Sequence, residues 1–156
     1  MQPTDSMATK SWIKRNRAAD YRRFVVQKLL IEKYFPCFTC RLSRRRLRCD
    51  GLITPSEHCD TYRIAISYEQ DGIPKVRIKE PEIAPSPAIH MYSNGNLCLY
   101  KPADDPWTAR DNIHEKIIPW TAEWLVFYEL YRICGKWLGP EAPHGSGEKT
   151  PQREIR

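Results

Sequence analysis

The chain has 156 residues, of which 41% are hydrophobic, enough for one domain with a core and too few for two ordinary catalytic domains. Its net charge of +6 is uneven, because residues 1–50 hold 13 Lys and Arg against 4 Asp and Glu, and the remainder holds 12 against 15. The sequence contains no run of 18 apolar residues and no N-terminal secretory signal, so we expect a soluble cytoplasmic protein without a membrane span. In that reducing setting we expect the six cysteines to be free thiols, metal ligands or a nucleophile.

The first half of the chain predicts a helix followed by a strand meander. Residues 1–9 are polar and are expected to be disordered. Apolar residues recur at near-helical spacing from Ser11 to Tyr34, and Pro36 ends the predicted helix. Short segments with partial alternation, separated by turn signals, predict an antiparallel set of strands at Leu47–Ile53, Tyr62–Tyr68 and Lys75–Ile78.

The second half begins with a crossing segment and ends in helices. Three prolines in the seven residues from Pro81 to Pro87 exclude a helix interior or a central strand there. A short helix is predicted at Pro106 with Asp105 as its cap. A long amphipathic helix, ended by Gly139-Pro140, is predicted from an apolar stripe that we assign to the core: Trp120, Trp124, Phe127, Tyr131, Cys134 and Leu138. The pattern indicates an α+β domain over residues 10–139, followed by a flexible tail over 140–156.

One cysteine lies in a segment with the groups that acyl transfer requires. Cys98 is flanked by Leu97 and Leu99, with turn-forming residues before it and a histidine, His90, upstream. Such chemistry needs a nucleophilic sulfur and amide donors for a tetrahedral oxyanion. The residues alone leave two interpretations open, a nucleophile and a buried structural thiol.

The segment Asn94-Gly95-x-Leu97-Cys98-Leu99, with a histidine upstream and Trp107 downstream, resembles the active-site segment of ubiquitin-conjugating enzymes. Together with Trp120–Leu125, Tyr128-Glu129 and Gly135–Gly139, it is similar to bacterial ubiquitin-conjugating-like proteins of CBASS anti-phage operons. The resemblance implies a ubiquitin-conjugating-enzyme-like fold: an N-terminal helix, an antiparallel meander, an active-site loop and C-terminal helices.

The resemblance also implies roles for individual residues. It makes Cys98 the thioester-forming nucleophile of an acyltransferase, and His90 the counterpart of the histidine in the family's His-Pro-Asn motif. Met91-Tyr92 stand where Pro-Asn is expected, so the oxyanion-holding asparagine is missing from its usual place. Asn94 and Asn96 are the candidates to replace it.

The same resemblance implies that the acyl donor is the C-terminal glycine of a cGAS/DncV-like nucleotidyltransferase (CD-NTase). It does not identify the acceptor. The chain has no glycine-rich phosphate loop, so we expect activation of the donor to be supplied from outside this chain or bypassed. No cofactor is expected.

Other cysteines and a histidine raise the question of a metal site. A zinc site would need four ligands to converge from Cys37, Cys40, Cys49, His58 and Cys59. Their spacings are irregular, and we predict no metal. A regulatory disulfide between one of these thiols and Cys98 is left open.

The basic run from Arg41 to Arg48 admits three interpretations: a solvated strand edge, a dock for an acidic partner, and a nucleic-acid contact. The run lacks the interleaved aromatic residues on which bases stack, so nucleic-acid binding is not favoured. We interpret the basic first third as a protein-docking surface. The alternative functions are a catalytically inactive scaffold of the same fold and a basic nucleic-acid-binding module.

Overall fold

The computed structural model describes residues 6–70, 72–99 and 105–140, with side chains described from Arg17 onward. It confirms the α+β class. No helix in these ranges is long and apolar enough to cross a membrane. The elements in chain order are α1 (Ser6–Tyr34), β1 (Phe38–Leu42), β2 (Arg46–Ile53), β3 (Tyr62–Glu69), β4 (Lys75–Glu80), the 3-10 helix η1 (Pro87–Ile89) and α2 (Ile117–Cys134).

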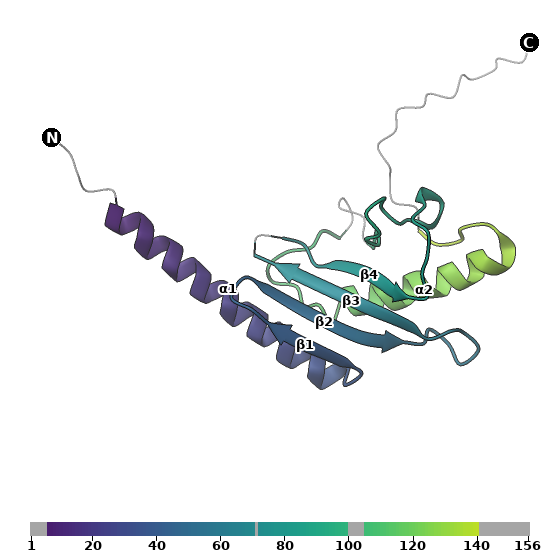
Figure 1. Cartoon of the computed structure of the whole chain (residues 1–156), viewed down its shortest axis with the longest axis horizontal. Coiled ribbons are helices and arrows are strands. Elements are labelled where there is room, and N and C mark those ends of the chain that lie inside the picture. Colours follow the sequence, from purple (N-terminus) through teal and green to yellow (C-terminus); the bar gives the residue numbers. More distant parts are fainter. Residues whose placement is uncertain (1–5, 71, 100–104, 141–156) are drawn as a thin grey trace, which may run out of the picture.

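The four strands form an antiparallel sheet in the order β1-β2-β3-β4 (Figure 1). The three predicted strands are confirmed as β2, β3 and β4. Strand β1 was not predicted from the sequence; it has only five residues, follows the end of α1 and includes the first two residues of the basic run. The basic run itself turns from β1 into β2, where the Ser43 N–H donates to the carbonyl of Arg46.

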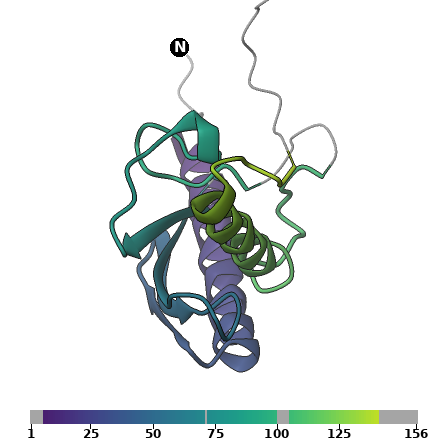
Figure 2. The same ribbon diagram turned by 90° about the vertical axis from the view of Figure 1, so that its right-hand side faces the viewer.

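Both helices cover the same face of the sheet, as Figure 2 shows edge-on. Every second residue of β3 is buried on this face, and each of these residues is at most 2% exposed: Tyr62, Ile64, Ile66 and Tyr68. The intervening residues of β3 lie on the opposite face, which we call the outer face. The apolar core therefore lies between the sheet and the helices, and the outer face is left polar.

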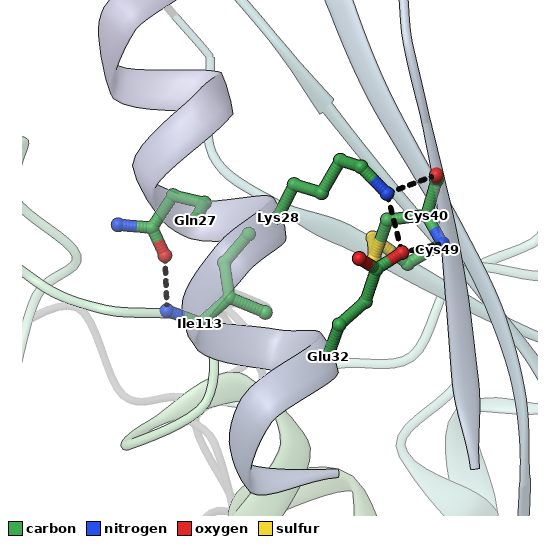
Figure 3. Close-up of a disulfide and its surroundings, with 6 residues drawn as sticks. All are labelled: Gln27, Lys28, Glu32, Cys40, Cys49 and Ile113. Carbon is green, nitrogen blue, oxygen red and sulfur yellow. Dashed lines mark hydrogen bonds and ion pairs between the residues drawn. A yellow bond between two sulfur atoms is a disulfide. The ribbon is translucent and has the colours of Figure 1, made fainter. Parts of the chain in front are cut away.

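Helix α1 begins at Ser6, five residues before the predicted start, and it is tied to the edge strand β1 (Figure 3). The Lys28 ammonium donates to the carbonyl of Cys40 over 3.0 Å, and the Cys40 N–H donates to the Glu32 carboxylate over 3.0 Å. An edge strand leaves such backbone groups unpaired. These two side chains satisfy them and join α1 to the sheet.

Cys40 and Cys49 form a disulfide across β1 and β2, so the expectation of free thiols is wrong for this pair. The two residues are register partners with Cα atoms 4.1 Å apart, in the short range of a non-hydrogen-bonded antiparallel pair. Because β1 was not predicted, the spacing of these two cysteines in the sequence did not indicate that they pair. Among the described residues, no group of three or more His, Cys, Asp or Glu is placed to hold a metal.

Helix α2 begins three residues before Trp120 and ends four residues before Leu138, the two ends of the predicted stripe, and its buried face differs from that stripe. Its buried residues are Ile117, Ile118, Thr121, Trp124 and Leu125. The helix ends at Cys134 because Gly135 adopts the left-handed conformation, and its N–H donates to the Tyr131 carbonyl over 2.8 Å. Cys134 and Leu138 are exposed, so their assignment to the core is wrong.

The helix predicted at Pro106 is absent, since residues 105–116 form turns. Asp105 does not cap a helix. Its carboxylate pairs with Lys116 at 2.6 Å. Gln27 of α1, almost fully buried, accepts a hydrogen bond from the Ile113 N–H at 2.9 Å (Figure 3). Contacts from distant parts of the chain thus fix this segment in an irregular form. The predicted tail, except for Pro140, lies outside the described residues.

Candidate functional site

The cysteine singled out by sequence lies in a short hairpin laid along the edge of β4. We call residues 90–98 the Cys98 loop. Met91 and Leu97 pair with each other in antiparallel fashion, and both are at most 6% exposed. The Leu97 N–H donates to the Val76 carbonyl of β4 over 2.9 Å. Two apolar side chains and the β4 backbone therefore anchor the loop.

The tip of the loop is a turn that requires glycine. The Gly95 N–H donates to the Tyr92 carbonyl over 2.8 Å, and the Asn94 side-chain oxygen accepts from the Asn96 N–H over 3.0 Å. Gly95 has a φ of 86°, in the left-handed region. A Cβ there would also lie 3.3 Å from the Arg77 guanidinium. The Asn94-Gly95 pair thus sets the reversal that returns the chain to Cys98.

Cys98 follows directly after the Leu97 anchor. Its thiol is free and partly exposed. Its backbone N–H donates to the carbonyl of His90 over 2.9 Å. The structure therefore brings His90 and Cys98 together, through the main chain.

The His90 side chain is packed into an aromatic group. It is 6% exposed, and its ring centroid lies 5.1 Å from that of Trp137. Its backbone is left-handed, with a φ of 53°, where it ends η1. The indole N–H of Trp124 donates to the carbonyl of the preceding residue, Ile89, over 2.9 Å. Trp124 and Trp137 thus support the start of the Cys98 loop. Sequence reasoning assigned Trp124 to the core and gave Trp137 no separate role.

The two candidate oxyanion residues lie on the outer face of the sheet. Asn94 and Asn96 line a groove there, beside Arg77. Asn96 pairs with Arg77 as an isolated bridge. Across the described part of the chain, no hydrogen bond joins either amide to Cys98. The structure therefore groups these asparagines with the basic side chains of the sheet.

With this geometry established, comparison with known proteins identifies the family. The sequence pattern described as "Type II CBASS E2 protein" matches residues 27–145, about three quarters of the chain. The chain belongs to this family. A search of curated proteins found no match. The matched region of this CBASS E2 protein begins within α1 and includes the sheet, the Cys98 loop and α2.

In this CBASS E2 protein, charged groups hold together the turns before α2. The Lys116 ammonium lies 2.6 Å from Asp105 and 3.1 Å from Asp111. A hydrogen bond from the Thr108 N–H lowers the pKa of the Asp111 carboxyl, and the bond to Asp105 raises the pKa of Lys116. Asp111 and Lys116 therefore stay ionised near neutral pH. The ion pair between Lys116 and Asp105 connects the two ends of the turn segment.

The aromatic residue downstream of Cys98 has a packing role. Trp107 is half-buried, and its ring meets the Tyr68 ring edge-on with centroids 5.8 Å apart. This contact holds the segment after the Cys98 loop against the core face of β3.

Proposed function

We propose that this protein is a ubiquitin-conjugating-like acyltransferase in bacterial CBASS defence. In this proposal Cys98 forms a thioester with the C-terminal glycine of a CD-NTase and passes the acyl group to an acceptor. The observation that carries the proposal is a free, partly exposed thiol at the end of an anchored loop, inside the region matched by the family. The order of helix, meander, loop and helix agrees with a ubiquitin-conjugating-like fold.

The proposed reaction has two acyl-transfer steps. In the first, a bond forms between the Cys98 sulfur and the glycyl carbonyl of an activated donor, while the bond to the activating group breaks and the thiol proton passes to solvent. In the second, an amine or hydroxyl attacks the thioester carbonyl, a bond to its nitrogen or oxygen forms, the Cys98 thiolate leaves, and the proton of the nucleophile passes to solvent. The sulfur must be open to large partners, and its partial exposure meets this need.

His90 serves in this proposal as a positioning residue, because its carbonyl holds the Cys98 N–H and its ring is packed against Trp137. Asn94 and Asn96 remain the candidates for oxyanion donors. To serve, one amide must turn from the outer face toward the thioester carbonyl when the donor is bound.

Trapping the acyl intermediate tests this function. The protein is co-expressed with its operon neighbours and resolved by non-reducing electrophoresis and intact mass spectrometry. We expect an adduct that carries the CD-NTase C-terminus and is removed by reductant. Cys98→Ser should give an adduct that resists reductant, since an oxyester replaces the thioester, and Cys98→Ala should give none.

The matched control replaces the three other free cysteines, Cys37, Cys59 and Cys134, by serine. This variant should still form the reductant-sensitive adduct. An adduct that persists in Cys98→Ala, or one that disappears in the triple control, contradicts the assignment of Cys98 as the nucleophile.

A further inference from the structure

The outer face of the sheet carries a group of cations that have no carboxylate partner among the described residues. Two outer-face arginines are paired, Arg46 with Glu69 at 3.5 Å and Arg63 with Glu80 at 3.4 Å. Five further outer-face cations make no ion pair within the described part of the chain: Arg41, Arg48, Lys75, Arg77 and Lys79. All five are exposed.

The strand register places these cations close together. Arg41 is directly opposite Arg48, and Arg48 and Lys75 flank Ser67 in the same row. Like charges directly opposite in a sheet repel one another. Lys75, Arg77 and Lys79 follow one another at every second residue of β4, about 7 Å apart. A bound anion would relieve this repulsion.

Four of these five cations, all except Arg41, line a groove of about 450 Å³. Asp50 is the one carboxylate among the described residues that line it. Its cationic and amide lining consists of Arg48, Lys75, Arg77, Lys79, Asn94 and Asn96. The groove, which we call the basic groove, thus joins the cations of the sheet to the tip of the Cys98 loop.

The basic groove leads toward the cysteine. Asn96 is two residues from Cys98, so their Cα atoms are at most about 7 Å apart. A polypeptide lying in the groove at Asn96 is therefore within a few residues of the thiol. Amide side chains offer both a donor and an acceptor, which suits a peptide backbone.

We propose that the basic groove binds a carboxylate-rich segment of the polypeptide whose C-terminus is delivered to Cys98. This inference rests on the proposed function, since it assigns a binding surface to the same acyl donor. Charge complementarity selects an acidic occupant. No aromatic side chain lines the groove in the described part of the chain, so it lacks the stacking surface of a single-strand nucleic-acid site. An acidic peptide fits this lining better than RNA.

Fluorescence anisotropy with a labelled twelve-residue peptide of alternating Glu and Gly tests the proposal, with the Gln-Gly peptide as the uncharged reference. The groove variant is Arg48→Glu with Lys75→Glu, which spares Arg77 because Arg77 contacts the turn at Gly95. The matched control is Arg17→Glu with Arg22→Glu, two exposed residues of α1. Each pair of reversals lowers the net charge from +6 to +2, because each reversal changes it by two.

We expect the groove variant to bind the acidic peptide at least about tenfold more weakly and the control to change Kd less than about twofold. Equal loss in both variants, or no loss in the groove variant, overturns the proposal. So does tighter binding of a twelve-nucleotide uridine RNA than of the acidic peptide. If the reversal variant fails to fold, Arg48→Gln with Lys75→Gln gives the same comparison.

The outcome separates this inference from the proposed function. Cys98→Ala should bind the acidic peptide with unchanged Kd, because the thiol is outside the groove lining. Peptide binding without adduct formation removes the catalytic assignment alone. If the groove variant changes neither the yield of adduct nor the Kd for the acidic peptide, the role of the groove is wrong and the catalytic assignment stands.

Discussion

Reduction of the Cys40–Cys49 disulfide is expected to lower the free energy of unfolding by roughly 2.6 kcal/mol, as estimated from the entropy of closing a short loop in the unfolded chain. The cysteines are 9 residues apart in sequence, which corresponds to a closure entropy of about 9 cal/mol/K. At a urea m-value of about 1–3 kcal/mol/M, the urea concentration at the unfolding midpoint should fall by about 1–3 M. The Cys98 loop should keep its conformation after reduction, because it is anchored to β4 and the core and does not contact β1 through these bonds.

Two measurements check this expectation. Urea unfolding is compared with and without a phosphine reductant, using Cys40→Ala with Cys49→Ala as the control whose midpoint should not respond to reductant. Intact mass after denaturing alkylation should show four adducts before reduction and six after it, since four cysteines are free and two are paired. Six adducts without reductant, or an unfolding midpoint that reductant does not move, would show that the disulfide is absent or does not stabilise the fold.

Three further predictions concern the anchors of the site and the helix contacts. Leu97→Ala should lower the free energy of unfolding by about 2–5 kcal/mol, because it leaves a cavity under the Cys98 loop. It should also reduce adduct formation at Cys98. An unchanged yield of adduct would contradict the anchoring role of Leu97. Gln27→Ala should lower the free energy of unfolding by about 1–3 kcal/mol, because it leaves the buried Ile113 N–H unpaired. The amide hydrogen of Ile113 should then exchange with solvent faster. An unchanged exchange rate would argue against this contact. The hydrogen bond from Lys28 holds the pKa of Glu32 below its ordinary value of 4.5, so its stabilisation is present above about pH 4.5 and is lost as pH falls through the lower folded-state value. The stability difference between Glu32→Gln and the parent protein should therefore shrink in acid, and a constant difference would count against this ion pair.

Local patterns in the sequence were sufficient to predict most of the regular structure. Alternation identified β2, β3 and β4, and helical spacing identified α1 and α2, because each of these elements has one side facing a core. The turn residues before Cys98 also indicated a loop. The short strand β1 carried too weak a pattern, and the boundary of α2 depended on the left-handed Gly135.

The fold class, the family resemblance and the interest in Cys98 all follow from the sequence alone, since they depend on local motifs and their order. The tertiary structure was needed to show which cysteines pair, because Cys40 meets Cys49 through a strand register that spacing does not encode. It also decided that Cys134 is exposed, since helix length and rotation depend on packing against the sheet. The charge imbalance was visible in the composition. The basic groove arises from β-pairing, which places Arg48 of β2 and the lysines of β4 on one face, on either side of β3.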